Sequence, residues 1–131
     1  MMRLDTVGKN AFLKVLYTVM LQDKVLSDEE EKTLELISKE IFKLEDYEQT
    51  NLKTSEKTAT EINKIKSETA IVFLAEILVY IAKNSTEKKS IVEFLHQVFL
   101  GVEMPEDIKT RLFDMIKQQL IFMGSRLAPP V

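Results

Sequence analysis

The sequence has no cysteine and no tryptophan, and its 131 residues include one histidine, three glycines and three prolines. The lack of cysteine excludes a disulfide framework and any thiolate metal site. The single histidine has no neighbour that resembles a catalytic triad, which argues against nucleophilic catalysis. The three glycines are scattered and form no phosphate-binding loop. We therefore expect a protein that is not an enzyme.

The scarcity of glycine and proline also bears on the fold. Hydrophobic residues make up 45% of the sequence and charged residues 30%, which is too apolar for a disordered chain. With so few chain breakers, the many short turns of a β-sandwich or barrel are not expected. We expect an all-α fold, a compact bundle of about six helices. It should form a single domain over residues 1–124, followed by a loose tail over residues 125–131.

Residues 70–82 are apolar at every position except Glu76. A helix that is hydrophobic on nearly all sides lies either in a protein core or in a membrane. Because a bilayer requires about 20 apolar residues, this run is too short to cross one. We therefore expect it to be the central helix of the bundle, capped by Ser67 and ending near Lys83, with no membrane insertion.

Apolar residues at three- and four-residue spacing predict the remaining helices. We expect them over residues 5–22, 27–43, 56–66, 87–101 and 105–124, with a connecting loop at 45–55. Ser27 and Glu30 fit a capping box, in which each side chain accepts a hydrogen bond from the other residue's backbone amide. The segment from Asn84 to Glu87 fits a second such box, and Gly124 is expected to end the last helix.

Two of the predicted helix pairs resemble each other in sequence. The matching positions are Phe12, Leu13, Leu16, Glu30, Leu34 and Ile37 in the first pair and Phe73, Leu74, Ile77, Glu87, Ile91 and Phe94 in the second. This internal similarity predicts that the bundle is built from two pseudo-repeated helical hairpins.

The formal net charge is -3, and it is unevenly distributed along the chain. Nine of the 21 acidic residues lie between residues 28 and 48, against three lysines. Nucleic-acid binders usually carry a clustered basic face, so no nucleic-acid partner is expected. No signal-peptide pattern accompanies the apolar run at residues 11–21, and we expect a cytoplasmic location.

The turn at residues 21–30 reads Leu-Gln-Asp-Lys-Val-Leu-Ser-Asp-Glu-Glu. It resembles the Asp-Gly-x-Ile-Ser-x-x-Glu turn of the TerB-like family, which is named for tellurite resistance. The resemblance implies a compact helical bundle that acts as a stress-response or protein-interaction module. It also implies that Asp23 and Glu30 stand at the positions of an acidic patch proposed to hold a divalent cation.

The residues of this turn allow two interpretations. Asp23, Ser27, Asp28 and Glu30 offer the oxygen ligands that calcium and magnesium prefer, which predicts a divalent-cation site. Alternatively, Asp23 ends the first helix and Glu30 only completes the capping box.

The acidic helix that follows the turn predicts an interaction surface for a partner protein. Besides the residues of the turn, this surface is expected to include Glu29, Glu31 and Glu35. The alternative is that these charges only keep an exposed helix face in contact with water.

Two further functions are compatible with the sequence. Glu93 and His96 form a Glu-x-x-His pair that, together with Glu76, could serve a metal-dependent hydrolytic or redox bundle. The other alternative is a homodimer without ligand, in which methionine and phenylalanine residues of the last helix form the contact.

Overall fold

The computed structural model describes residues 4–23 and 25–127, without the side chains of Asp23 and of residues 119–127. All regular structure in this part of the chain is helical. The elements are α1 (Thr6–Met20), the 3-10 helix η1 (Leu21–Asp23), α2 (Asp28–Leu36), the π-helix η2 (Ile37–Ile41), the 3-10 helix η3 (Gln49–Leu52), α3 (Thr58–Asn63), α4 (Glu68–Lys83), α5 (Lys88–Leu100) and α6 (Glu106–Leu127).

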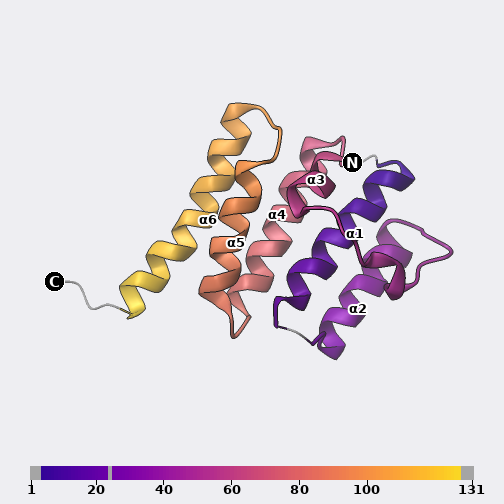
Figure 1. Ribbon diagram of the computed structural model, residues 1–131, viewed down its shortest axis with the longest axis horizontal. Coiled ribbons are helices and arrows are strands. Elements are labelled where there is room, and N and C mark those ends of the chain that lie inside the picture. Colours follow the sequence, from indigo (N-terminus) through magenta and orange to yellow (C-terminus); the bar gives the residue numbers. More distant parts are fainter. Residues whose placement is uncertain (1–3, 24, 128–131) are drawn as a thin grey trace.

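The helix α4 lies in the middle of the bundle, as predicted. It packs against α1 on one side and against α5 and α6 on the other, while α2 lies beyond α1 (Figure 1). Leu74 and Leu78 of α4 are fully buried, whereas Glu76 and Tyr80 form an exposed strip on the same helix. None of the described helices is long and apolar enough to cross a membrane.

The first, second and central helices all carry side-chain caps, and those of the second and central helices were predicted. The Asp5 carboxylate accepts a hydrogen bond from the Gly8 amide at 2.7 Å and caps α1. Ser27 and Glu30 form the capping box at the start of α2. The Ser67 hydroxyl accepts a hydrogen bond from the Ala70 amide at 3.2 Å at the start of α4. Each cap satisfies a backbone N–H group that the helix leaves open at its first turn.

One predicted cap and one predicted helix end are wrong. The second capping box is not formed, because α5 begins only at Lys88 and the Glu87 amide instead donates to the Ser85 hydroxyl at 3.0 Å. The last helix does not end at Gly124 but continues to Leu127. Glycine costs about 1 kcal/mol inside a helix relative to alanine, which weakens a helix without terminating it. The remainder of the predicted tail, residues 128–131, lies outside the described residues.

The second predicted helix changes its winding after Leu36. The Phe42 amide donates to the Ile37 carbonyl at 2.8 Å, five residues back, so η2 is a π-helix. Ile37 and Phe42 are both buried, although a regular turn of 3.6 residues would not place residues five apart on one face. The same change turns Ile41, which the periodicity predicts to be buried, toward solvent with 47% of its surface exposed.

The end of η2 is fixed by α1. Lys43 has a φ of 56°, in the left-handed region, and reverses the chain. The Lys9 ammonium of α1 donates to the Phe42 carbonyl at 2.9 Å. The Phe42 ring packs edge-on against Phe12, with 5.1 Å between ring centroids. These contacts hold the acidic segment firmly against the rest of the bundle.

Candidate functional site

The acidic turn begins at η1 and leads into α2. The Ser27 amide donates to Glu30 Oε1 at 3.0 Å, and the Glu30 amide donates to Ser27 Oγ at 3.1 Å. The hydroxyl of Ser27 and one oxygen of Glu30 are thus engaged in the cap. Within the described residues, no three acidic or histidine side chains are grouped so that they could hold a metal ion. The Asp23 side chain and Lys24 lie outside the described residues, so the cation site stays a prediction.

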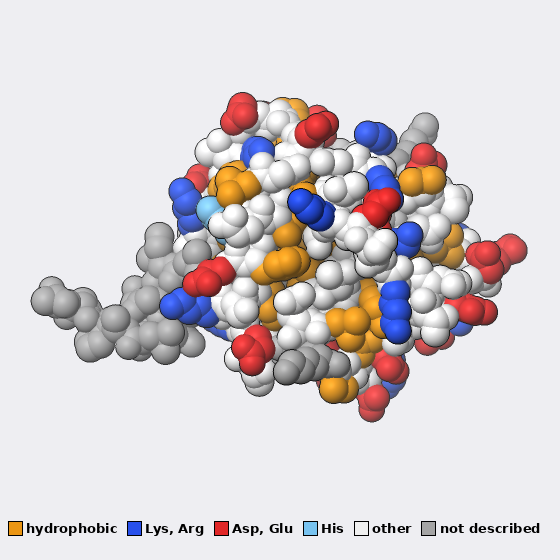
Figure 2. Space-filling model, in the orientation of Figure 1, with side chains coloured by type: hydrophobic (Ala, Val, Ile, Leu, Met, Phe, Trp, Pro, Cys, Tyr) orange, Lys and Arg blue, Asp and Glu red, His pale blue; other side chains and the backbone are white. Residues whose placement is uncertain are grey.

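The carboxylates of α2 form an exposed surface. We define the α2 acidic face as Asp28, Glu29, Glu31 and Glu35, all of which are exposed, together with the half-buried Glu30. Figure 2 shows acidic side chains gathered along this edge of the molecule, over α2 and the segment that follows it. Four of these residues lie in the first turn of α2, where negative charge favours the positive end of the helix dipole.

An apolar side chain stands beside these charges. Leu36 is 56% exposed and lines a shallow groove of about 260 Å³. The groove is bordered by Lys32, Glu35, Lys39 and Glu40. Lys39 and Glu35 form an ion pair of 3.0 Å in which both side chains are more than half exposed. Because an exposed pair contributes little to stability, these charges are available to a partner at small energetic cost.

Tyr47 lies near the α2 acidic face, and the charges of that face affect its pKa. Its side chain is half-buried in the segment after η2. Burial raises the pKa of Tyr47 above 10.0, and the negative charges of Glu35 and Glu31 raise it further, with a smaller effect of Tyr17. Tyr47 is therefore a neutral hydrogen-bonding group at the edge of the α2 acidic face at neutral pH.

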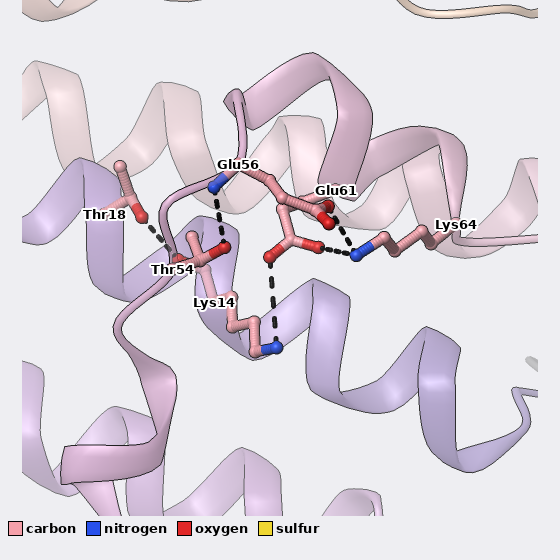
Figure 3. Close-up of polar contacts among 6 residues, drawn as sticks. All are labelled: Lys14, Thr18, Thr54, Glu56, Glu61 and Lys64. Atoms are coloured by element: carbon pink, nitrogen blue, oxygen red, sulfur yellow. Dashed lines mark hydrogen bonds and ion pairs between the residues drawn. The ribbon is translucent and has the colours of Figure 1, made fainter.

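A second charged cluster, which the sequence interpretation missed, lies on the other side of α1. Glu61 of α3 is only 1% exposed, and its carboxylate lies 2.8 Å from the Lys64 ammonium and 4.0 Å from that of Lys14 (Figure 3). Lys64 also pairs with Glu56 at 2.6 Å. Neither oxygen of Glu61 receives a well-aligned hydrogen bond from the described residues, so its compensation is mainly ionic.

The pKa of Glu61 reflects this environment. Burial alone would raise it, but the contacts with Lys64 and Thr54 and the positive charges of Lys14 and Lys64 together hold the pKa below 4.5. Glu61 is therefore ionised at neutral pH and is enclosed by cations from two helices. Because the carboxylate is only 1% exposed and contacts ammonium groups from both segments, we interpret the cluster as a tie between α1 and α3. The i,i+3 spacing of Glu61 and Lys64 was its only signal in the sequence.

The alternative metal site is not formed. Glu76 lies in a groove between α4 and α6, whereas Glu93 and His96 line a different groove, at α5. Glu76 and Glu93 are exposed, and the His96 ring packs against Phe113 with 5.2 Å between ring centroids. The helical spacing did place Glu93 and His96 close together, but Glu76 belongs to another face of the bundle. The hypothesis of a metal centre built from these three residues is therefore wrong.

Compared with known protein families, with curated proteins and with solved structures, the chain matches none. The resemblance to the TerB-like family thus continues to depend on the ten-residue turn alone. The function has to be inferred from the surfaces that the described residues present.

Proposed function

We propose that this chain is a non-catalytic helical domain that binds a partner protein through the α2 acidic face. The observation that carries the proposal is the position of Leu36. This large apolar side chain is more than half exposed and lines a groove together with Glu35 of the α2 acidic face. Charges alone are typical of an ordinary solvated helix face. Charges around an exposed leucine combine the polar rim and the apolar centre of a protein-recognition surface.

The chemistry of the surface indicates the kind of partner. Lysine or arginine side chains of a partner would meet Asp28, Glu29, Glu31 and Glu35, and an apolar side chain would cover Leu36. Long-range attraction would mainly raise the association rate, and it would weaken with salt because exposed charges are screened over about 8–10 Å. The partner is therefore expected to present a basic segment with one apolar anchor.

The rigid attachment of α2 supports this proposal. The capping box fixes the start of the helix, and the Lys9 contact with Phe42 fixes the end of η2. A surface held in one conformation loses little conformational entropy when it binds. The family resemblance adds a stress-response role to the proposal, and the lack of a signal-peptide pattern adds a cytoplasmic location.

Charge reversal tests the surface. A variant carrying Glu29→Lys, Glu31→Lys and Glu35→Lys should recover at least tenfold less of its partner from a lysate of the source organism, measured by quantitative mass spectrometry. The matched control reverses Glu93, Glu103 and Asp114, which are exposed on other parts of the bundle. Equal recovery by both variants would contradict the proposal.

Cation binding at the turn is a separate part of the proposal. Chelator-treated protein is titrated with calcium and with magnesium while amide NMR signals are followed, and the titration is repeated on Asp23→Asn. Saturable shifts confined to residues 22–31 and lost in the variant would support a site. Unchanged spectra would leave Ser27 and Glu30 with their capping role only.

A further inference from the structure

A groove of about 340 Å³ runs between α4 and α6. Its apolar lining consists of Val72 from α4 and of Ile108, Leu112 and Met115 from α6. Leu112 is buried, while the other three side chains are only partly covered by the core. The positions on α6 follow the i, i+4, i+7 spacing of a single helix face, so the apolar part of the lining follows that face of the helix.

The two rims of this groove carry opposite charges. Glu68 and Glu76 border it on the α4 side, and Arg111 borders it on the α6 side. All three side chains are exposed, and none of them forms an ion pair with any residue that the structure describes. A partner that covers the groove would therefore have to bring a carboxylate to Arg111 and a cation to the glutamates.

The helix that supplies most of the groove is longer than the helix beside it. α6 has 22 residues and α5 has 13, which correspond to about 33 Å and about 20 Å of helix. Figure 1 shows the C-terminal part of α6 extending away from α5 and from the rest of the bundle.

We propose that the α4–α6 groove is a dimer interface and that its occupant is a second copy of this chain. In a dimer with two-fold symmetry, each surface patch faces the same patch on the other copy. Arg111 of one copy would then face Glu76 of the other, and the reciprocal pair would form at the same time. A surface with opposite charges on its two rims is complementary to a second copy of itself, so no different protein is required.

A stable dimer needs a larger interface than the groove alone provides, so the contact should also include the extending turns of α6. A stable interface buries about 800 Å² per partner. The groove accounts for part of such an area, and the extending turns of α6 lie next to it on the same helix. A second copy would cover both with one contact.

Complementary charge reversal tests the proposal directly. Arg111→Glu places glutamates on both rims, and Glu76→Arg places an additional cation opposite Arg111. Each variant alone should dimerise at least tenfold more weakly than the wild type, whereas an equimolar mixture should form a heterodimer because both ion pairs are restored. Sedimentation velocity from about 1 to 500 μM measures the association, with one variant fluorescently labelled to identify the mixed species.

Controls separate this result from misfolding and from other contacts. Lys89→Glu and Glu93→Arg make the same charge changes on α5, outside the groove, and should dimerise like the wild type. Circular dichroism and thermal unfolding verify that each variant is folded. Reversal of the α2 acidic face should leave dimerisation unchanged, so this proposal and the partner-binding proposal can fail independently.

Three outcomes would overturn the dimer. The wild type could sediment as a monomer at 500 μM, which would mean that a helix of another protein, and not a second copy, covers the groove. The single variants could dimerise as well as the wild type, which would place the contact on another face. The mixture could fail to associate although each variant is folded, which would contradict the Arg111–Glu76 pairing.

Discussion

The Glu61 carboxylate lies 2.8 Å from the ammonium of Lys64, the residue that directly follows α3. The carboxylate is enclosed by the bundle, whereas the Lys64 side chain is 35% exposed. The two partners therefore differ in what they lose when the other is removed. A solvated lysine can recover its interaction with water, but a buried carboxylate cannot.

This asymmetry predicts the order of two substitutions. Lys64→Met should destabilise the protein more than Glu61→Gln, because it leaves an ionised carboxylate buried with Lys14 at 4.0 Å as its remaining cation among the described residues. Glu61→Gln removes the charge, and we expect it to lower the free energy of unfolding by about 1–2 kcal/mol. Urea unfolding at pH 7 measures both values.

A matched pair on the surface provides the control. Lys39 and Glu35 are 3.0 Å apart but both exposed, so Lys39→Met should change stability very little. The double variant Glu61→Met with Lys64→Met should be more stable than Lys64→Met alone, since the uncompensated charge is gone. If Lys64→Met and Lys39→Met had equal effects, the explanation by burial would be wrong.

The lowered pKa of Glu61 makes a prediction for acid pH. Because its pKa in the folded protein lies below its ordinary value of 4.5, ionised Glu61 adds stability above pH 4.5. That contribution should be lost as the pH falls from about 4.5 through the folded-state pKa. The difference in unfolding free energy between wild type and Glu61→Gln should therefore shrink between pH 5 and pH 3. Urea unfolding at several pH values measures it, and a constant difference would contradict the prediction.

The fold could largely be inferred from the sequence because its signals are local. The helical periodicity, the capping box of Ser27 and Glu30 and the cap by Ser67 each depend on residues within one or two turns. The π-helix was not predictable, since it arises where Ile37 and Phe42 both pack on the core and Lys9 holds the chain end from another helix. The internal repeat of two hairpins stays a prediction.

The candidate sites, like the fold, could be predicted where the signal is local in sequence and not where it depends on distant residues. Sequence composition was sufficient to locate the α2 acidic face, because charge along one helix can be counted directly. Glu61 was missed because its burial depends on Lys14, which is far away in sequence. Glu76 was grouped wrongly with Glu93 and His96, because the periodicity gives the face of each helix but not which faces meet in the bundle.

The potential of the α2 acidic face can be measured through Tyr47. Glu31→Gln with Glu35→Gln should lower the pKa of Tyr47, because two negative charges that oppose ionisation are removed. The value should stay above 10.0, since burial is the largest cause of the shift. Ultraviolet titration of the phenolate, compared with the same titration of Tyr47→Phe, isolates this residue from Tyr17 and Tyr80. Glu93→Gln is the control and should have no effect on it.

A substitution at the residue with a left-handed conformation at the end of η2 is predicted to increase stability, whereas the substitutions in the Glu61 cluster decrease it. Lys43 has a φ of 56°, where a side chain with a Cβ atom crowds the backbone. Glycine tolerates this conformation, so Lys43→Gly should raise the free energy of unfolding by about 0.5–1 kcal/mol. Lys32→Gly places the same substitution inside α2 and should lower it by about 1 kcal/mol. Thermal unfolding compares the two variants, and a loss of stability in both would show that Lys43 contributes through its side chain rather than through its backbone conformation.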